Sequence, residues 1–125
     1  MATALKNQVK QGCVMLPMND ETYALRRSVM GIIYEAKKFV TLPRVEVRIV
    51  ETTPCLMGYA KMGQNIIHIG AKYAKESGKC LEHVVLHEIL HAVKSTKHDP
   101  KCPLMNASYT VLPQRVIWDS FKKYF

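Results

Sequence analysis

Residues 79–95 read KCLEHVVLHEILHAVKS, a strongly apolar segment that predicts a buried helix of several turns. Its aliphatic residues are Val84, Val85, Leu86, Ile89, Leu90, Ala92 and Val93. Among them stand His87, Glu88 and His91, whose burial without partners would cost free energy. A metal ion is the simplest partner that accounts for all three polar side chains.

The spacing of these polar residues suits metal-assisted hydrolysis. Histidines four residues apart lie one turn above each other on a helix, so His87 and His91 can bind one ion. Glu88 is rotated by about 100° around the helix axis, so we expect it to act on a water and not as a ligand. Zinc (Zn²⁺) makes such a water acidic, and Glu88 would serve as the general base.

A catalytic zinc site needs a third protein ligand, and the sequence after residue 91 offers few. No glutamate follows Glu88, which excludes a later glutamate as that ligand. The candidates are His98, Asp99, Cys102 and Asp119. We expect His98 to be the ligand, with Asp99 next, because neutral imidazole suits zinc and the loop can fold back. His83, one turn before His87, is expected to pack or cap, and His68 to be structural or exposed.

The rest of the chain predicts one α+β domain over residues 1–125. The expected elements are a strand within Val9–Met18, a helix from Asn19-Asp20 ending before Pro43, a strand at Val45–Val50, a hairpin or strand pair of Met57–Lys61 and Asn65–Ile69, and a closing helix after Leu112. The segment between Ile69 and Ser77 is expected to be a polar loop that connects the strands to the apolar helix. We expect a monomer without repeats or linkers.

Composition narrows the functional classes. The chain of 125 residues contains no apolar run long enough for a membrane span, so we expect no membrane partner. The N-terminus does not resemble a secretory signal, which favours the cytoplasm or a host-cell interior and reduced cysteines. Lysine and arginine total 18 against 10 acids, a net charge of +8. Because these cations are spread along the sequence, a solvated basic surface is favoured over nucleic-acid binding.

The segment from His87 to Asn106 resembles the metzincin clan of zinc peptidases. Metzincins combine H-E-x-x-H-x-x-G-x-x-H with a methionine turn below the metal, and His98 with Leu104-Met105-Asn106 is similar to that arrangement. Cys102 before the Met-Asn pair is especially like the archaemetzincins. The resemblance implies a minimal zincin-like fold with a small mixed sheet, an active-site helix, a methionine turn and a C-terminal helix.

The resemblance also implies functional assignments. The chain would be a zinc metalloendopeptidase acting on a peptide or protein, with zinc on His87, His91 and His98. Met105 would form the floor of the site, and Tyr109 would donate a hydrogen bond to the oxyanion. The strand Asn65–Ile69 would be the sheet edge that pairs with an extended substrate.

This sequence departs from the metzincin pattern at one place. The last histidine comes seven residues after His91 where the family has six, and Lys94 occupies the position of the family's glycine. A helix that runs on to Ser95 or Thr96 before turning would compensate for this shift. Two alternatives stay open: a SprT- or WLM-type protease acting on DNA-bound proteins, and a non-catalytic zinc-binding regulatory protein.

Overall fold

A computed structural model of the protein describes residues 16–51, 58–76, 78–107 and 111–125. Its elements are α2 (Asp20–Lys37), β1 (Glu46–Val50), β2 (Gly58–Ala60), β3 (Ile66–Gly70), α3 (Ala71–Glu76), α4 (Gly78–Lys94) and α5 (Gln114–Lys122). The predicted α+β class is confirmed, as are the predicted helices and strands within the described ranges. Most of the strand expected at Val9–Met18 lies outside those ranges, and residues 16–18 form no regular element.

The three described strands form one mixed sheet in the order β1-β3-β2. β1 runs parallel to β3, and β2 forms an antiparallel hairpin with β3. The expectation that residues 65–69 form a sheet edge is therefore wrong, because β3 is paired on both sides. A hairpin was one of the two arrangements expected for these segments. The sequence of β1 did not indicate that β1 would pair with β3 and leave β2 at the edge.

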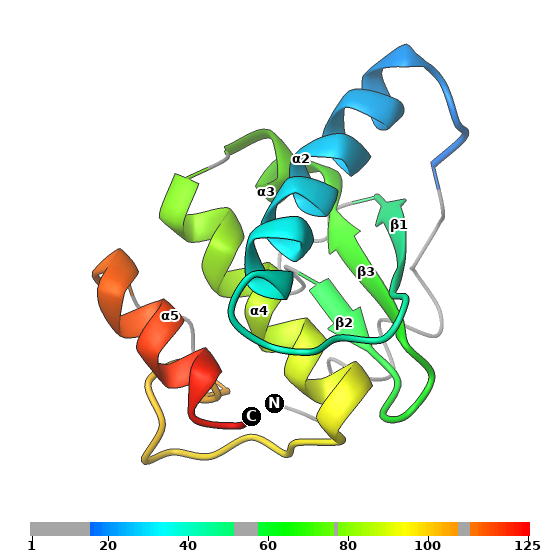
Figure 1. Ribbon diagram of the computed structural model, residues 1–125. Coiled ribbons are helices and arrows are strands. Elements are labelled where there is room, and N and C mark those ends of the chain that lie inside the picture. Colours follow the sequence, from blue (N-terminus) through cyan, green and yellow to red (C-terminus); the bar gives the residue numbers. More distant parts are fainter. Residues whose placement is uncertain (1–15, 52–57, 77, 108–110) are drawn as a thin grey trace.

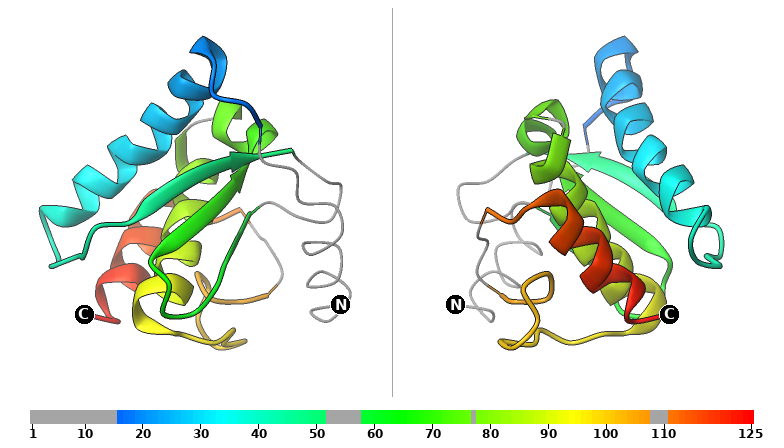
Figure 2. Two further views of the ribbon diagram at one scale, coloured as in Figure 1. Left: turned by 90° about the vertical axis from the view of Figure 1, so that its right-hand side faces the viewer. Right: turned by 60° about the vertical axis from the view of Figure 1, so that its left-hand side comes forward.

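The apolar core lies between one face of the sheet and the helices (Figures 1 and 2). Val47, Ile49, Ile67 and Ile69 alternate along β1 and β3 and are buried with the apolar side chains of α2 and α4. α2 packs on β1, α4 packs on β2 and β3, and α5 covers the side of α4 away from the strands. Each fully buried Leu or Ile contributes about 1.5–3 kcal/mol to the stability of this arrangement.

The short helix α3 was not predicted. It follows β3 directly, and its six residues span less than two helical turns, too few for an apolar periodicity to show in the sequence. Ala74 supplies its buried contact with the core, while Lys75 forms an ion pair of 2.8 Å with Glu21 of α2. α3 therefore connects the sheet to the start of α4 and also contacts α2.

The β2–β3 turn is fastened to the end of α4. The backbone N–H of Gly63 donates to the carbonyl of Ala92 at 2.8 Å, which satisfies one of the carbonyls that a helix end leaves unpaired. Gly63 has a φ of 78°, a left-handed conformation that glycine adopts without the steric cost of a side chain. This hydrogen bond fixes the hairpin relative to the helix that carries the candidate site.

No helix in the described ranges is long and apolar enough to cross a lipid bilayer. The longest described helix, α2, has 18 residues and exposes charged residues along one face, while its other face is buried.

The N-terminus of α2 is held by a reciprocal cap. The Thr22 N–H donates to Asn19 Oδ1 at 3.0 Å, and the Asn19 N–H donates to Thr22 Oγ1 at 2.8 Å. We predict that Asn19→Ala lowers the free energy of unfolding by about 1 kcal/mol, because the Thr22 N–H loses its side-chain acceptor. Urea denaturation measures the change, and Asn19→Asp should retain most of the stability. Equal losses in both variants would contradict the role of the side-chain acceptor.

Candidate metal centre

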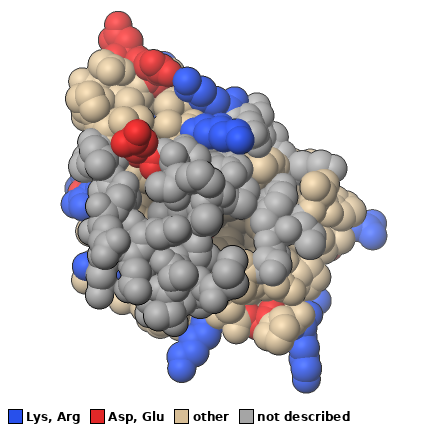
Figure 3. Space-filling view, turned by 180° about the vertical axis from the view of Figure 1, so that it is seen from behind, with Lys and Arg blue, Asp and Glu red and all other residues tan. Residues whose placement is uncertain are grey.

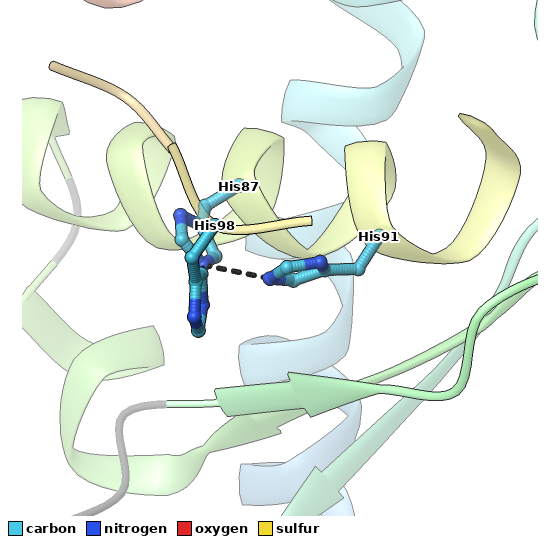
Figure 4. Close-up of side chains that lie close together, drawn as sticks. All are labelled: His87, His91 and His98. Atoms are coloured by element: carbon cyan, nitrogen blue, oxygen red, sulfur yellow. Dashed lines mark hydrogen bonds between the residues drawn. The ribbon is translucent and has the colours of Figure 1, made fainter. Parts of the chain in front are cut away.

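Three histidine rings converge on one point beside α4. His87 Nε2 lies 3.0 Å from His91 Nε2 and 3.3 Å from His98 Nε2. The candidate ligand atoms of all three residues lie within 4.8 Å of one another. Figure 4 shows the two helical rings projecting from α4 toward the ring of His98. The three residues expected from the sequence are therefore brought together.

The chain turns out of α4 one residue later than in the metzincin pattern. The helix ends at Lys94, so it does not continue to Ser95 or Thr96. Ser95 instead adopts a left-handed φ of 52°, and the Thr96 N–H donates to the Leu90 carbonyl at 3.1 Å. The turn and the third histidine are thus both displaced by one position. This double displacement lets His98 reach the helical pair.

Backbone carbonyls orient the two helical rings from behind. His87 Nδ1 lies 2.7 Å from the Leu104 carbonyl oxygen, and His91 Nδ1 lies 2.5 Å from the Thr96 carbonyl oxygen. A carbonyl oxygen only accepts, so each Nδ1 carries the proton and donates it. In a neutral ring the Nε2 atom then presents a lone pair. This is the arrangement found behind histidines that bind metals.

The donor set fits a zinc-like cation. With both Nδ1 atoms protonated, the Nε2 atoms of His87 and His91 face each other with no proton to share, so a positive ion between them removes a repulsion. Nitrogens about 2.0–2.1 Å from a tetrahedral zinc lie about 3.3 Å apart. Two of the three separations, 3.0 and 3.3 Å, agree with that geometry, and the third lies within 4.8 Å.

The surroundings of the three rings favour the neutral form that binds metals, although His91 is buried, His87 partly buried and His98 exposed. Desolvation is the largest cause of each shift: it lowers the pKa of His87 to about 3 and lowers the pKa of His91 and of His98. The carbonyl partners of His87 and His91 oppose this effect without reversing it. The imidazoles are therefore neutral at pH 7, and no proton has to leave before a cation binds.

Glu88 lies outside the histidine cluster, as its rotation around the helix predicts. Its side chain is buried, and desolvation raises the pKa of the carboxyl to about 8. β2 packs closely here: a Cβ at Gly58 would lie 3.4 Å from Glu88 Cγ and 2.7 Å from the His68 carbonyl oxygen. Glycine at position 58 thus allows the edge strand to approach the helix beside the candidate base.

The alternative ligands have other partners. The Asp99 carboxylate accepts from the Lys101 N–H at 2.9 Å, and the Asp99 N–H donates to the Met105 carbonyl at 2.9 Å. Cys102 hydrogen-bonds the Tyr124 hydroxyl and, with burial, raises the pKa of that tyrosine to about 12. Asp119 lies on α5 near Lys122. Among the described residues, only the three histidines form a group that could hold a metal ion.

Other residues singled out in the sequence have structural surroundings. His83 is buried on α4 one turn before His87, and its ring packs against that of His87 with the centroids 6.5 Å apart. His68 stacks on Tyr59 across the hairpin, with ring centroids 4.0 Å apart. Met105 is fully buried in the core. Tyr109, the expected oxyanion donor, lies outside the described residues.

Three contributors to the site were missed in the sequence. The carbonyls of Leu104 and Thr96 act through the backbone, which no residue type reveals. Gly58 carries a weak signal, since a glycine within a strand pattern often marks a close approach of another segment. All three act on the site only through their positions in the folded structure, next to side chains of α4.

Comparisons with protein-family models, curated proteins and solved structures found no match for this chain.

We predict that His98→Ala weakens zinc affinity by more than about 100-fold, beyond the effect typical of residues that only orient ligands. Asp99→Asn should leave the affinity nearly unchanged, because the amide oxygen can still accept from the Lys101 N–H. Competition with a chromophoric zinc chelator measures both affinities. A larger loss for Asp99→Asn than for His98→Ala would transfer the ligand role to Asp99.

The raised pKa of Glu88 predicts a pH dependence of the metal-free protein. Between the ordinary carboxyl pKa of 4.5 and the folded value of about 8, the folded state keeps a proton that the unfolded chain releases. The contribution of Glu88 to the free energy of unfolding therefore falls as pH rises through this window. Glu88→Gln lacks this loss, so its stability relative to the unsubstituted protein should increase from pH 4.5 to pH 8.

Urea denaturation in the presence of a metal chelator, at the two ends of this window, tests the dependence. The measured quantity is the difference in free energy of unfolding between the Glu88→Gln variant and the unsubstituted protein. A difference that is independent of pH would contradict the burial of an ionisable carboxyl at this position.

Proposed function

We propose that this protein is a zinc-dependent metalloendopeptidase with His87, His91 and His98 as ligands and Glu88 as general base. The observation that carries the proposal is the convergence of three imidazole Nε2 atoms beside a buried glutamate on the same helix. A purely structural zinc site is closed by four protein ligands and has no need of a base. Here the described residues supply three ligands, which leaves one position for water or substrate.

The metal and the chain have separate tasks in this proposal. A bound zinc would supply Lewis acidity, making a water acidic near pH 7 and polarising the substrate carbonyl. The three neutral rings hold the ion, and the carbonyls of Leu104 and Thr96 keep two of them in the correct tautomer.

Glu88 carries the proton transfers. Its carboxylate accepts a proton from the attacking water and then delivers it to the nitrogen of the leaving amine. Burial makes this carboxylate a stronger base than an exposed one, as the raised pKa shows. A divalent cation in the adjacent histidine cluster would favour the ionised form of the Glu88 carboxyl. With zinc bound, Glu88 would therefore be able to accept a proton near neutral pH.

The sheet edge beside Glu88 suits an extended peptide. β2 pairs only with β3 among the described strands, and Gly58 of β2 lies against Glu88. A substrate that adds to β2 by main-chain hydrogen bonds would pass next to the catalytic carboxyl. The substrate-binding edge is thus assigned to β2 instead of residues 65–69. Main-chain binding of this kind favours peptides and unfolded protein segments.

The loop from Ser95 to Met105 supports a metzincin-like arrangement. Met105 is fully buried, and its carbonyl accepts the Asp99 N–H that closes the loop. The left-handed residue and the third histidine both occur one position late, which preserves the relation between the turn and the ligand. We therefore propose a metzincin-like site in which Ser95 replaces the family's glycine as the turning residue.

We predict that Glu88→Gln reduces kcat for peptide hydrolysis by about 100-fold or more, because the amide cannot accept the proton. Zinc content should remain at about one ion per chain. A quenched-fluorescence peptide library and an unfolded protein substrate provide the assay, and elemental analysis provides the zinc content. Retained activity would contradict the base assignment.

Glu82→Gln is the matched control on the same helix. Glu82 accepts from Trp118 Nε1 at 2.6 Å and from Gln114, away from the histidine cluster, so this variant should keep its activity. If the unsubstituted, zinc-loaded protein hydrolyses no peptide, the non-catalytic zinc-binding alternative replaces the peptidase.

A further inference from the structure

We propose that a groove between α2 and the N-terminal ends of β1 and β3 binds single-stranded nucleic acid. The groove has a volume of about 500 Å³. Its polar lining consists of Arg26, Tyr34 and Lys37 from α2, Arg44 before β1, Glu46 at the start of β1, and Gln64 and Asn65 from the β2–β3 turn. The Glu46 N–H donates to the Asn65 carbonyl at 2.9 Å, which joins the start of β1 to the end of the β2–β3 turn. Figure 1 shows the β2–β3 turn at the lower right and the segment from α2 to β1 running below α2 toward it.

The cations of the groove lack acidic partners. Arg26, Lys37 and Arg44 form no ion pair with any described residue, although four such pairs occur elsewhere in the described ranges. Glu46 is the one acid lining the groove, and its carboxylate pairs with Arg48 at 2.5 Å. Three unneutralised cations around one hollow attract a ligand that carries several negative charges.

The non-ionic part of the lining favours a nucleic acid over an acidic peptide. Tyr34 is 60% exposed, and the Lys37 ammonium lies 5.7 Å from the centre of its ring. An exposed aromatic ring beside cations is the usual platform on which single-stranded bases stack. The amides of Gln64 and Asn65 offer donors and acceptors to base edges. An acidic peptide would use the cations but has no need of the ring.

The groove lies apart from the histidine cluster. Figure 3 shows the molecule from behind, where the visible lysine and arginine side chains lie around the edge, with several together at the top. The groove shares no residue with the histidine cluster, so this inference does not depend on the proposed peptidase activity.

Fluorescence anisotropy with labelled oligo(dT) and oligo(U) of about 12 nucleotides tests the proposal on the full chain. Lys37→Gln combined with Arg44→Gln should weaken binding about tenfold or more. The salt dependence, as log Kd against log salt concentration, should become shallower by about 1.4, since each neutralised phosphate contributes about 0.7. Tyr34→Ala should weaken binding about tenfold at an unchanged salt slope, and Tyr34→Phe should restore it.

The matched control is Arg115→Gln combined with Lys123→Gln, which removes the same charge from exposed positions of α5 and its end. This control should bind far more tightly than the groove variant. Glu88→Gln should bind as the unsubstituted protein does, which separates this test from that of the peptidase. Unchanged melting temperatures confirm that the exposed substitutions preserve the fold.

Three results would overturn the proposal. The first is the absence of saturable binding at low salt. The second is an equal loss in the groove and control variants, which would indicate only net charge. The third is displacement of the oligonucleotide by a polyglutamate peptide with no effect of Tyr34→Ala, which would assign the groove to acidic peptides.

Discussion

Two main-chain carbonyls determine how the C-terminal third of this protein is arranged. The Leu104 carbonyl accepts from His87, and the Thr96 carbonyl accepts from His91. An imidazole on a helix can rotate about its side-chain bonds, and only an outer hydrogen bond selects one tautomer and one orientation. The chain after α4 must therefore return along the helix. The left-handed turn at Ser95 and the closure from Asp99 to Met105 are the means by which it does so.

The arrangement of the histidine cluster also requires that α4 be rigid, because His98 on the loop can approach His87 and His91 only if those two side chains stay in place. α4 is packed between the sheet and α5, and Glu82 joins it to α5 by accepting from Gln114 and Trp118. On its other side, the β2–β3 turn binds the Ala92 carbonyl in the last turn. The helix is thus held along most of its length. The two histidines and Glu88 share one backbone whose position is set by these three neighbours.

The parts of the fold that depend on local sequence could be predicted. The cap at Asn19, the helical histidine spacing and the alternation in β1 are each written in a few adjacent residues. The strand order could not be predicted from the sequence. β1 and β2 come to lie on either side of β3 because α2 packs on β1 and α4 packs on β2 and β3. α3 was missed because six residues carry too little periodicity.

The same division holds for the sites. The three histidines of the cluster were identifiable from residue type and spacing, while the carbonyls that orient two of them were not. The basic residues of the groove looked dispersed because they lie at positions 26, 37 and 44 of the sequence. The fold brings them around one hollow, since α2 runs alongside the segment that enters β1. Charge clusters of this kind are a property of tertiary structure.

Main-chain hydrogen bonds close the loop, so the position of His98 does not depend on the exposed side chains of the loop. Between Asp99 and Met105 the exposed side chains are those of Pro100, Lys101 and Pro103, while Leu104 and Met105 are buried. Changes at the exposed positions alter the rim of the site without moving His98, provided that residue 101 keeps its backbone N–H. This short loop is therefore a natural place for sequence diversification, where the exposed side chains beside the three histidines can change while the histidines keep their arrangement.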